Sequence, residues 1–499
     1  MKKRVLAVNA PAYDQSKAFF PPEIAYLVSA FKKNGIQCDV FDANFDKDME
    51  TDVIESIPAL YDFVCIFADC YPFPYSDDYA FPYMLRIARQ IKKVADIPVL
   101  IGGRYATLHH KEIVSCHNCF DIVVRGDVER IVVDIYNDYF HNGGFSTAFP
   151  GATYLKFQGE QKISDVIRLE EDLDELPFPS QKVQERYLVK KLADGSCKRF
   201  ISIMSSRGCP YHCKYCSSTI YKRKWTARSP ENVAEEVYAI SQKYGNVIVK
   251  FADDNFYVDL VRAKSIINQI AEKCNRIIEF TFCARADQIV KHGMENLLFF
   301  KKHGCNSIEI GIENGSSNSL LNYGKETTVE QNIRALNMVR NAKIFPSVDY
   351  ILFEPETSIN DLKKNLTFIK SQLWGYYHPV LYSKIVPLEG TQYEKYRYLS
   401  EEQYFTCKDV YHVYTSMNQF RSKYQNRINA LIDIMNSVQS NNVTINKRQY
   451  IWLRTLPYMF FSELITHQTW DQKLNFVDTF SLKEQVDEKL ALIEQQICL

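Results

Sequence analysis

The chain is 499 residues long, which predicts about three domains, and its 46% hydrophobic and 13% aromatic content is enough for real cores. Lys and Arg together number 60, as do Asp and Glu, so the charge gives no indication of a nucleic-acid partner or a membrane surface. No apolar run reaches the roughly 18 residues of a membrane span. The run at residues 5–8 is too short for a signal peptide, and 14 scattered cysteines indicate a reduced, cytoplasmic protein.

The first segment, residues 1–145, alternates predicted strands with predicted helices. A helix over residues 22–34 has apolar side chains at helical spacing and ends at Gly35, which is typical of a helix terminus. A second helix is expected over residues 80–93. The predicted strands cover residues 4–9, 36–42, 62–68, 98–101 and 121–124. This alternation predicts an open, Rossmann-like parallel sheet with ligands at the carboxyl ends of its strands.

Glycines follow two of these predicted strands. Gly102 and Gly103 end the fourth strand, and Gly126 follows the fifth. A missing side chain lets a ligand approach the backbone there, although a tight turn alone also explains a glycine. Residues 146–198 are predicted to be a connector, because the acidic run 171–175 is followed by prolines that favour an extended chain.

Strand–helix alternation returns in residues 199–395. Six strands are expected, over residues 200–204, 247–251, 277–283, 307–312, 347–353 and 380–386. Helical patterns separate them, and Ser229 followed by Pro230 is a favourable start for one of these helices. The pattern therefore predicts a second parallel α/β unit.

The loop after the first of these strands holds Cys209, Cys213 and Cys216 in the spacing Cys-x3-Cys-x2-Cys. Three thiolates in one loop can bind three irons of a [4Fe–4S] cube and leave the fourth iron open. An open metal position is a catalytic position. An odd number of cysteines argues against disulfides. A zinc ribbon lacks its second Cys-x2-Cys pair, and His212 could complete a zinc site but is expected to point elsewhere.

This motif resembles that of the radical S-adenosylmethionine (SAM) superfamily. The resemblance implies that SAM binds the open iron and that the reduced cluster cleaves it to a 5'-deoxyadenosyl radical. It also implies a partial (β/α)6 barrel, which the six strand–helix units match, with chemistry in the loops at the strands' carboxyl ends. Tyr215 matches an aromatic residue that lies near the adenine, and packing within the loop is its alternative explanation.

Polar residues at the other strand ends become candidate SAM contacts. By resemblance, Asp253 or Asp254 contacts the SAM amino group, and Glu313 faces SAM. Arg285 suits the SAM carboxylate through bidentate hydrogen bonding. A salt bridge inside the barrel is the alternative for each of these residues. Three further residues match the family: Lys325, Trp225 and Arg228. Arg228 is expected to position the cluster loop.

The segment before the barrel resembles the cobalamin-binding domain of a radical SAM subfamily. The resemblance rests on residues 21–35, on Gly102-Gly103 and on the turn at residues 126–129, where Val128 departs from the usual Gly-Glu-Gly-Glu. It implies that the glycines lie against cobalamin. The motif Asp-x-His-x-x-Gly is missing, so neither His109 nor His110 is expected to bind the cobalt. A sheet that has lost its cofactor and serves as a scaffold is the alternative.

Two regions bear on the substrate. Residues 353–357 lack both glycines of the family's Gly-x-Pro-Gly-Glu-Thr loop, so the substrate is expected to differ in shape from that of typical methylating members. Residues 396–499 are predicted to form a helical domain that caps the open side of the barrel. Core packing is the better explanation for the many aromatic residues of this domain.

The leading interpretation is a cobalamin-dependent radical SAM enzyme that methylates an unactivated carbon. The alternatives are cyclisation, oxidation or another rearrangement by a radical SAM enzyme, with or without cobalamin. A third interpretation is a cluster-bearing protein that binds SAM without turnover, against which the polar strand-end residues argue. The expected partners are a small-molecule or peptide substrate and a reductant such as flavodoxin or ferredoxin, with no nucleic acid and no membrane span.

Overall fold

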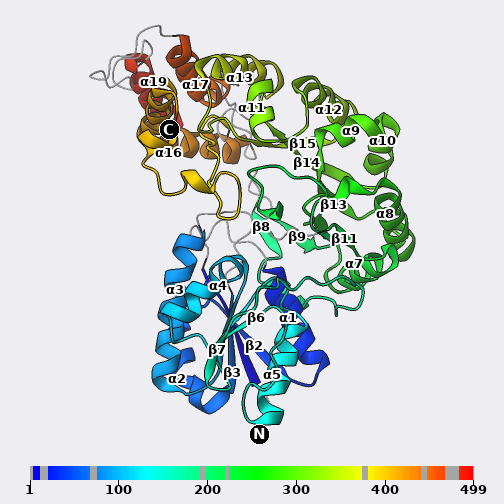
Figure 1. Cartoon of the computed structure of the whole chain (residues 1–499). Helices are drawn as coiled ribbons and strands as arrows, with labels where there is room; N and C mark the ends of the chain where they lie inside the picture. The colour runs from blue at the N-terminus through cyan, green and yellow to red at the C-terminus, as the bar shows by residue number, and fades with distance from the viewer. Residues whose placement is uncertain are drawn as a thin grey trace.

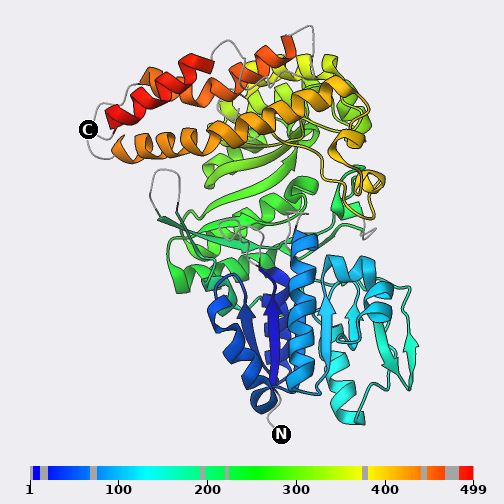
Figure 2. The ribbon, with the colours of Figure 1, turned by 90° about the vertical axis from the view of Figure 1, so that its left-hand side faces the viewer.

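The computed structural model describes residues 4–11, 21–67, 76–191, 197–219, 224–373, 380–439, 447–466 and 483–497. An N-terminal α/β part lies at one end, a second sheet with its helices lies in the middle, and C-terminal helices lie at the far end (Figures 1 and 2). Within these ranges, no helix combines the length and apolar character that crossing a membrane requires.

The N-terminal sheet has the strand order β2-β1-β3-β4-β5-β6-β7. Its first five strands are parallel, as the sequence predicts, and two apolar cores cover its faces. Burial on both faces explains why these strands are almost continuous apolar runs. The strands are β1 (Arg4–Asn9), β2 (Gln37–Asp42), β3 (Phe63–Phe67), β4 (Val99–Gly102) and β5 (Ile122–Val124). The helices are α1 (Pro22–Lys33), α2 (Glu50–Leu60), α3 (Ser76–Val94), α4 (Arg104–Cys116) and α5 (Ile131–Asn142).

The N-terminal sheet continues past residue 145. Two antiparallel strands, β6 (Ala152–Phe157) and β7 (Glu160–Lys162), extend it beyond β5. The segment expected to be a connector therefore contributes to this sheet before it reaches α6 (Gln181–Glu185) and β8 (Val189–Lys191).

The second sheet has the order β15-β14-β13-β12-β9-β8, in which only β8 runs antiparallel to its neighbour. Ser229 caps α7 by accepting a hydrogen bond from the Asn232 amide at 3.2 Å, as its sequence context predicts. The strands are β9 (Cys197–Ile203), β12 (Ile248–Phe251), β13 (Glu279–Arg285), β14 (Cys305–Glu313) and β15 (Phe345–Tyr350). The helices are α7 (Pro230–Tyr244), α8 (Leu260–Cys274), α9 (Ala286–His292), α10 (Met294–Lys302), α11 (Ser317–Asn322), α12 (Val329–Asn341) and α13 (Ile359–Gln372).

The prediction of a sixth strand over residues 380–386 is wrong. A single parallel bridge joins Phe353 to Lys384 instead. Ser383 turns back on Val380, with its hydroxyl 2.7 Å from the Val380 carbonyl oxygen, and Pro387 has no N–H with which to continue a ladder. Within the described residues, the sheet therefore has five parallel strands rather than six.

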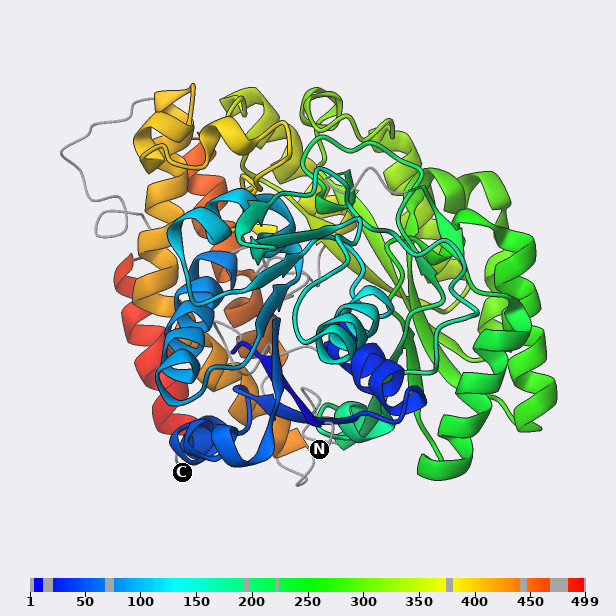
Figure 3. The same ribbon diagram turned by 60° about the horizontal axis from the view of Figure 1, so that its bottom comes forward.

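The C-terminal part is helical, as expected. Its helices are α15 (Glu401–Tyr404), α16 (Lys408–Gln439), α17 (Lys447–Thr466) and α19 (Lys483–Ile497). Aromatic residues fill the contacts among them; the rings of Phe420 and Phe460 stack 4.6 Å apart, and both side chains are fully buried. In Figure 3 the green helices of the second sheet and the orange and red C-terminal helices lie on opposite sides of the molecule.

Candidate functional site

The cysteine loop leaves the second sheet at the carboxyl end of β9. The two-residue strand β10 (Ser206–Arg207) pairs with β11 (Thr226–Ala227), which closes the base of the loop. Gly208 then adopts a φ of +83°, a conformation that side chains disfavour. Its amide donates to Asp254 Oδ2 at 3.0 Å, and the Lys214 amide donates to the Tyr323 carbonyl at 2.9 Å. Asp254 follows strand β12, and Tyr323 directly follows helix α11, so the loop is anchored to two separate parts of the second α/β unit.

The three cysteines differ from their neighbour His212 in exposure. Cys213 is buried and His212 is exposed, so the two adjacent side chains point in different directions, as expected. Burial raises the pKa of Cys209 to about 11. Among the residues that the structure describes, no three His, Cys, Asp or Glu side chains could hold one metal ion. Three thiols on three different irons of a cube do not need to share one ion.

The two adjacent carboxylates after β12 both hold the start of the cysteine loop. Asp253 is 3% exposed; it accepts from the Ser205 amide at 2.6 Å and from the Ser206 hydroxyl at 2.8 Å. Asp254 accepts from Gly208, as described above. The structure thus gives both residues a positioning role, whereas the sequence suggested contact with SAM.

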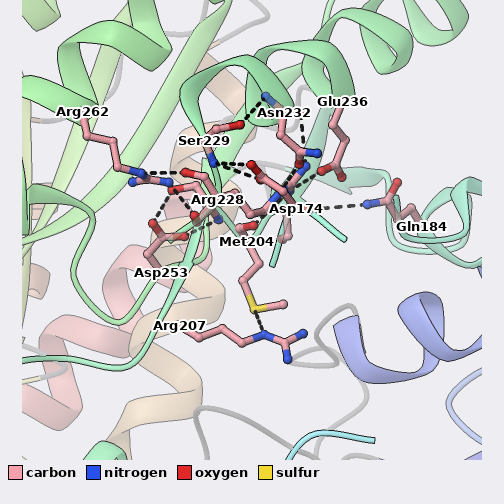
Figure 4. Close-up of polar contacts among 12 residues, drawn as sticks. Asp174, Gln184, Met204, Arg207, Arg228, Ser229, Asn232, Glu236, Asp253 and Arg262 are labelled. Carbon is pink, nitrogen blue, oxygen red and sulfur yellow. Dashed lines mark hydrogen bonds and ion pairs between the residues drawn. The ribbon is translucent and has the colours of Figure 1, made fainter. Parts of the chain in front are cut away.

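Two arginines support the same segment from the barrel side (Figure 4). Arg228 donates to the Met204 carbonyl at 3.1 Å and pairs with Glu236 at 2.5 Å. Arg262 donates to the carbonyls of Ser205 and Arg228. The guanidinium of Arg262 also lies over the ring of Trp225, 5.7 Å from its centroid.

Arg285, at the end of β13, reaches the second cysteine. One of its nitrogens lies 3.6 Å from Cys213 Sγ, and another donates to Asp287 at 2.9 Å. The third donates to the Lys325 carbonyl, and the guanidinium carbon lies 3.7 Å from the Tyr211 ring centroid. The sequence placed Arg285 and Cys213 in one site correctly, but it did not reveal their direct contact.

Glu313 and Lys325 form a buried ion pair of 2.7 Å next to that contact. Their exposed fractions are 6% and 5%. Burial would lower the pKa of Lys325, but Glu313 and Cys213 together outweigh burial and raise this pKa. A Cβ at Gly311 would lie 2.6 Å from Glu313 Oε1 and from Lys325 Nζ, so a side chain there would displace the pair from its present position. Tyr215 also faces Glu313, and burial together with this carboxylate raises its pKa well above the usual value.

The glycines of the N-terminal sheet are closely approached by other parts of the protein. A Cβ at Gly102 would lie 2.4 Å from the Phe67 ring and 3.2 Å from Val128. A Cβ at Gly126 would lie 2.0 Å from the Arg168 carbonyl oxygen. Gly103 has a φ of +104° where α4 begins. Packing and backbone conformation therefore account for these glycines, and the buried Val128 fills space beside Gly102.

Ion pairs join the N-terminal part to the site. Arg207, directly before the cysteine loop, contacts both carboxylate oxygens of Glu129 and lies 3.2 Å from Asp127. His109 Nε2 lies 2.5 Å from Glu389 of the loop after the missing sixth strand. Sequence reasoning missed both pairs, although the acidic turn at residues 126–129 and the arginine before Gly-Cys were visible signals.

Comparisons with known proteins agree with this arrangement. The sequence profile of the Radical SAM superfamily matches residues 203–369. An uncharacterized methyltransferase of Pyrococcus horikoshii is 27% identical over 286 residues, which are 57% of this chain and 60% of the relative. The chain thus spans about 60% of that relative's length.

Two solved structures share the fold. The cobalamin-dependent SAM radical enzyme OxsB, with aqua-cobalamin bound, has a TM-score of 0.76 at 16% identity over 99% of this chain and 80% of its own. The radical SAM methyltransferase TsrM from Kitasatospora setae, with cobalamin and a [4Fe–4S] cluster bound, has a TM-score of 0.60 at 16% identity over 74% of this chain and 73% of its own. Residues 203–369, which include the cysteine loop, thus form a domain that matches the Radical SAM superfamily, and the two solved structures show the fold that the chain shares.

Proposed function

We propose that this protein is a cobalamin-dependent radical SAM enzyme that methylates an unactivated carbon of a small-molecule or peptide substrate. One observation carries the proposal: Arg285 contacts the sulfur of Cys213, and the ion pair Glu313–Lys325 lies beside them. Charged groups converge here on the cysteine loop from two neighbouring strand ends, β13 and β14. Such convergence at the carboxyl ends of parallel strands is typical of active sites.

The residues of this loop suit an iron–sulfur cluster. Cys209, Cys213 and Cys216 would hold a [4Fe–4S] cluster, because three thiolates in one loop match three irons of a cube. When bound, the cluster supplies the electron that splits the sulfonium bond of SAM to give a 5'-deoxyadenosyl radical. Arg285 donates toward a ligand sulfur, and such hydrogen bonds tune the reduction potential of a cluster. Asp254 fixes the glycine that starts the loop.

The groups beside the loop suit SAM itself. Glu313 offers a carboxylate for the SAM amino group, and Lys325 and Arg285 supply positive charge for its carboxylate. Tyr215 lies against Glu313 and packs edge-on against Tyr323, with ring centroids 5.6 Å apart, which leaves it next to the same space. Its proposed role is contact with the adenine.

The assignment of cobalamin rests on the N-terminal fold, which OxsB shares over nearly the whole chain. Cobalamin, when bound, supplies the methyl group that is transferred. His109 contacts Glu389, and His110 Nδ1 lies 3.0 Å from the Thr153 hydroxyl, so both imidazoles have partners within the protein. The closely packed Gly102 and Gly126 favour a second candidate: a radical SAM rearrangement, cyclisation or oxidation enzyme whose N-terminal sheet is a scaffold without cobalamin.

The test is anaerobic reconstitution in the presence of iron, sulfide and cobalamin, with a cytoplasmic flavodoxin or ferredoxin as the proposed reductant. We expect absorption from both cofactors, and 5'-deoxyadenosine together with S-adenosylhomocysteine on a substrate that turns over. Cluster absorption without cobalamin absorption would contradict methylation and favour the second candidate. Absence of a cluster in the native protein, with a variant lacking all three cysteines as the reference, would contradict radical chemistry altogether.

A further inference from the structure

The two faces of the second sheet differ in character. Side chains of a strand alternate between its faces. On one face, the apolar residues of every strand are buried under helices α7 to α13. On the other face, the side chains toward the carboxyl ends of the strands are polar and partly or fully accessible, whereas Phe200 and Ile248 lie nearer the amino ends. The polar residues are Ser202, Lys250, Thr281, Cys283, Glu309 and Asp349. We call this face the inner face. A closed barrel fills its interior with bulky apolar side chains, and this sheet does not.

The inner face lies directly beside the proposed SAM site. Asp349 is the register partner of Gly311, and Gly311 is the residue whose missing side chain leaves room for the Glu313–Lys325 pair. Lys250 Nζ lies 3.4 Å from Glu309 Oε2, and Glu309 lies two residues before Gly311 on β14. A substrate resting on the inner face would therefore lie next to the group that binds SAM.

Charge on the inner face is unevenly balanced. Glu309 has Lys250 as its partner, and Glu313 has Lys325. Among the residues that the structure describes, no side chain donates a hydrogen bond to the carboxylate of Asp349. An excess of one carboxylate faces the space that a substrate would occupy.

Asp349 is accessible and lies among charged neighbours. Its side chain is solvent-accessible, yet burial raises the pKa of Asp349 well above its usual value. The carboxylates of Glu309 and Glu313 raise this pKa further, whereas Lys325 and Lys250 lower it. These effects disfavour the ionised form of Asp349, and a cationic ligand group would favour it.

We infer that the inner face is the substrate pocket of the proposed reaction, and that it takes a hydrophilic substrate whose ammonium group pairs with Asp349. The inference rests on the proposed function. The polar lining disfavours a lipid, and the excess of carboxylates disfavours a phosphorylated substrate. It thus narrows the substrate class to amine-bearing small molecules or peptides.

Cys283 reports on this space because its thiol is on the inner face, next to Glu309. In cluster-loaded protein without oxygen, Cys283 is labelled with a cationic thiosulfonate, 2-(trimethylammonio)ethyl methanethiosulfonate, or with its anionic 2-sulfonatoethyl counterpart. Labelling rates are read by peptide mass spectrometry and divided by those of the exposed Cys116 in α4. Burial raises the pKa of Cys283 and slows its reaction with both reagents. This slowing cancels when the labelling rate with one reagent is divided by the rate with the other.

We expect the cationic reagent to be preferred by about tenfold, which corresponds to roughly 1.4 kcal/mol. Asp349→Asn should reduce the preference to about twofold or less, and Asp52→Asn, an equal charge change on the remote helix α2, should retain it. Millimolar 1,4-diaminobutane should slow labelling by neutral methyl methanethiosulfonate, and butane-1,4-diol should not. An unreactive Cys283, a preference for the anion, or a preference unchanged in Asp349→Asn overturns the inference. Iron and sulfide content and deoxyadenosine formation, measured on the same sample, report separately on the proposed function.

Discussion

Arg207 and Glu129 form a buried ion pair that connects the cysteine loop to the acidic turn of the N-terminal sheet. Their side chains are 9% and 1% exposed, and the ring of Tyr26 from α1 lies 5.6 Å from the guanidinium. Arg207 immediately precedes Gly208 and Cys209 in the chain. The ion pair therefore ties the turn at residues 126–129 to a residue that lies two positions before the first cysteine.

Arg207→Met should destabilise the protein by about 3–5 kcal/mol, because it leaves Glu129 as a buried, unpaired charge. The double variant R207M/E129Q should recover part of this loss. Chemical denaturation measures both. A suitable control is Arg186→Met: Arg186 pairs with Asp46, also of the N-terminal part, but is 31% exposed, so its removal should cost about 1 kcal/mol or less. Equal losses of unfolding free energy in R207M and R186M would contradict the larger stabilising effect expected of the buried pair.

Removing the donor to Cys213 should change the cluster rather than the fold. Arg285→Lys keeps the charge but loses the fork that reaches Cys213 Sγ, Asp287 and the Lys325 carbonyl together. We expect iron and sulfide content to be retained and the cluster midpoint potential to fall by about 40 mV, which is the equivalent of one hydrogen bond of roughly 1 kcal/mol. Potentiometric titration followed by EPR measures the potential. Arg276→Lys, which affects only contacts with backbone carbonyls and Asn246, should leave it unchanged.

The contact between His109 and Glu389 should make stability depend on pH. Burial alone would lower the pKa of His109, but Glu389 and Glu112 outweigh it and raise the pKa. A raised pKa in the folded state means that the stabilisation is complete below the unfolded value of about 6.5 and is lost as pH rises through the folded pKa. Burial raises the pKa of Glu389, but His109 and Arg397 lower it further, so Glu389 stays ionised over that range.

The unfolding temperature of the native protein should therefore fall between neutral pH and pH ~9 more steeply than that of His109→Gln, by an amount worth on the order of 1 kcal/mol. His141→Gln, at the exposed end of α5, is the matched control and should follow the native curve. Parallel curves for the native protein and His109→Gln would show that this pair contributes nothing to the pH dependence.

The sequence predicted best what depends on local pattern. Strand β1 has the predicted bounds, because a β-branched apolar run leaves little choice, and the helix cap at Ser229 follows from one side chain. The sequence predicted less well the features that depend on contacts with other residues. The run at 380–386 is apolar enough for a strand, but Ser383 bonds back to Val380 and Pro387 blocks further pairing. The local sequence pattern does not reveal that other hydrogen bonds compete with strand pairing.

The candidate site shows the same division. The cysteine spacing is local, and so Cys209, Cys213 and Cys216 were found directly. Lys325 had no role in the sequence because its partner Glu313 comes from the preceding strand, and only the fold shows that Gly311 leaves room for both. Long-range pairs of this kind require the structure.

Variants of the Glu313–Lys325 pair distinguish a role in SAM binding from a role in protein stability alone. Lys325→Met should destabilise the protein by about 3–5 kcal/mol, since it leaves Glu313 buried and unpaired, and the double variant E313Q/K325M should recover much of that loss. SAM affinity, measured by equilibrium dialysis on cluster-loaded protein, should stay at least about tenfold weaker in both variants, because neither restores charges for the amino and carboxylate groups of SAM.

Lys243→Met is a matched control: Lys243 lies 2.7 Å from Glu185, the same distance as in the buried pair, but the two side chains are 46% and 41% exposed. It should change stability by less than about 1 kcal/mol and leave SAM affinity as it is. Recovery of SAM affinity together with stability in the double variant would mean that the pair only holds the barrel together.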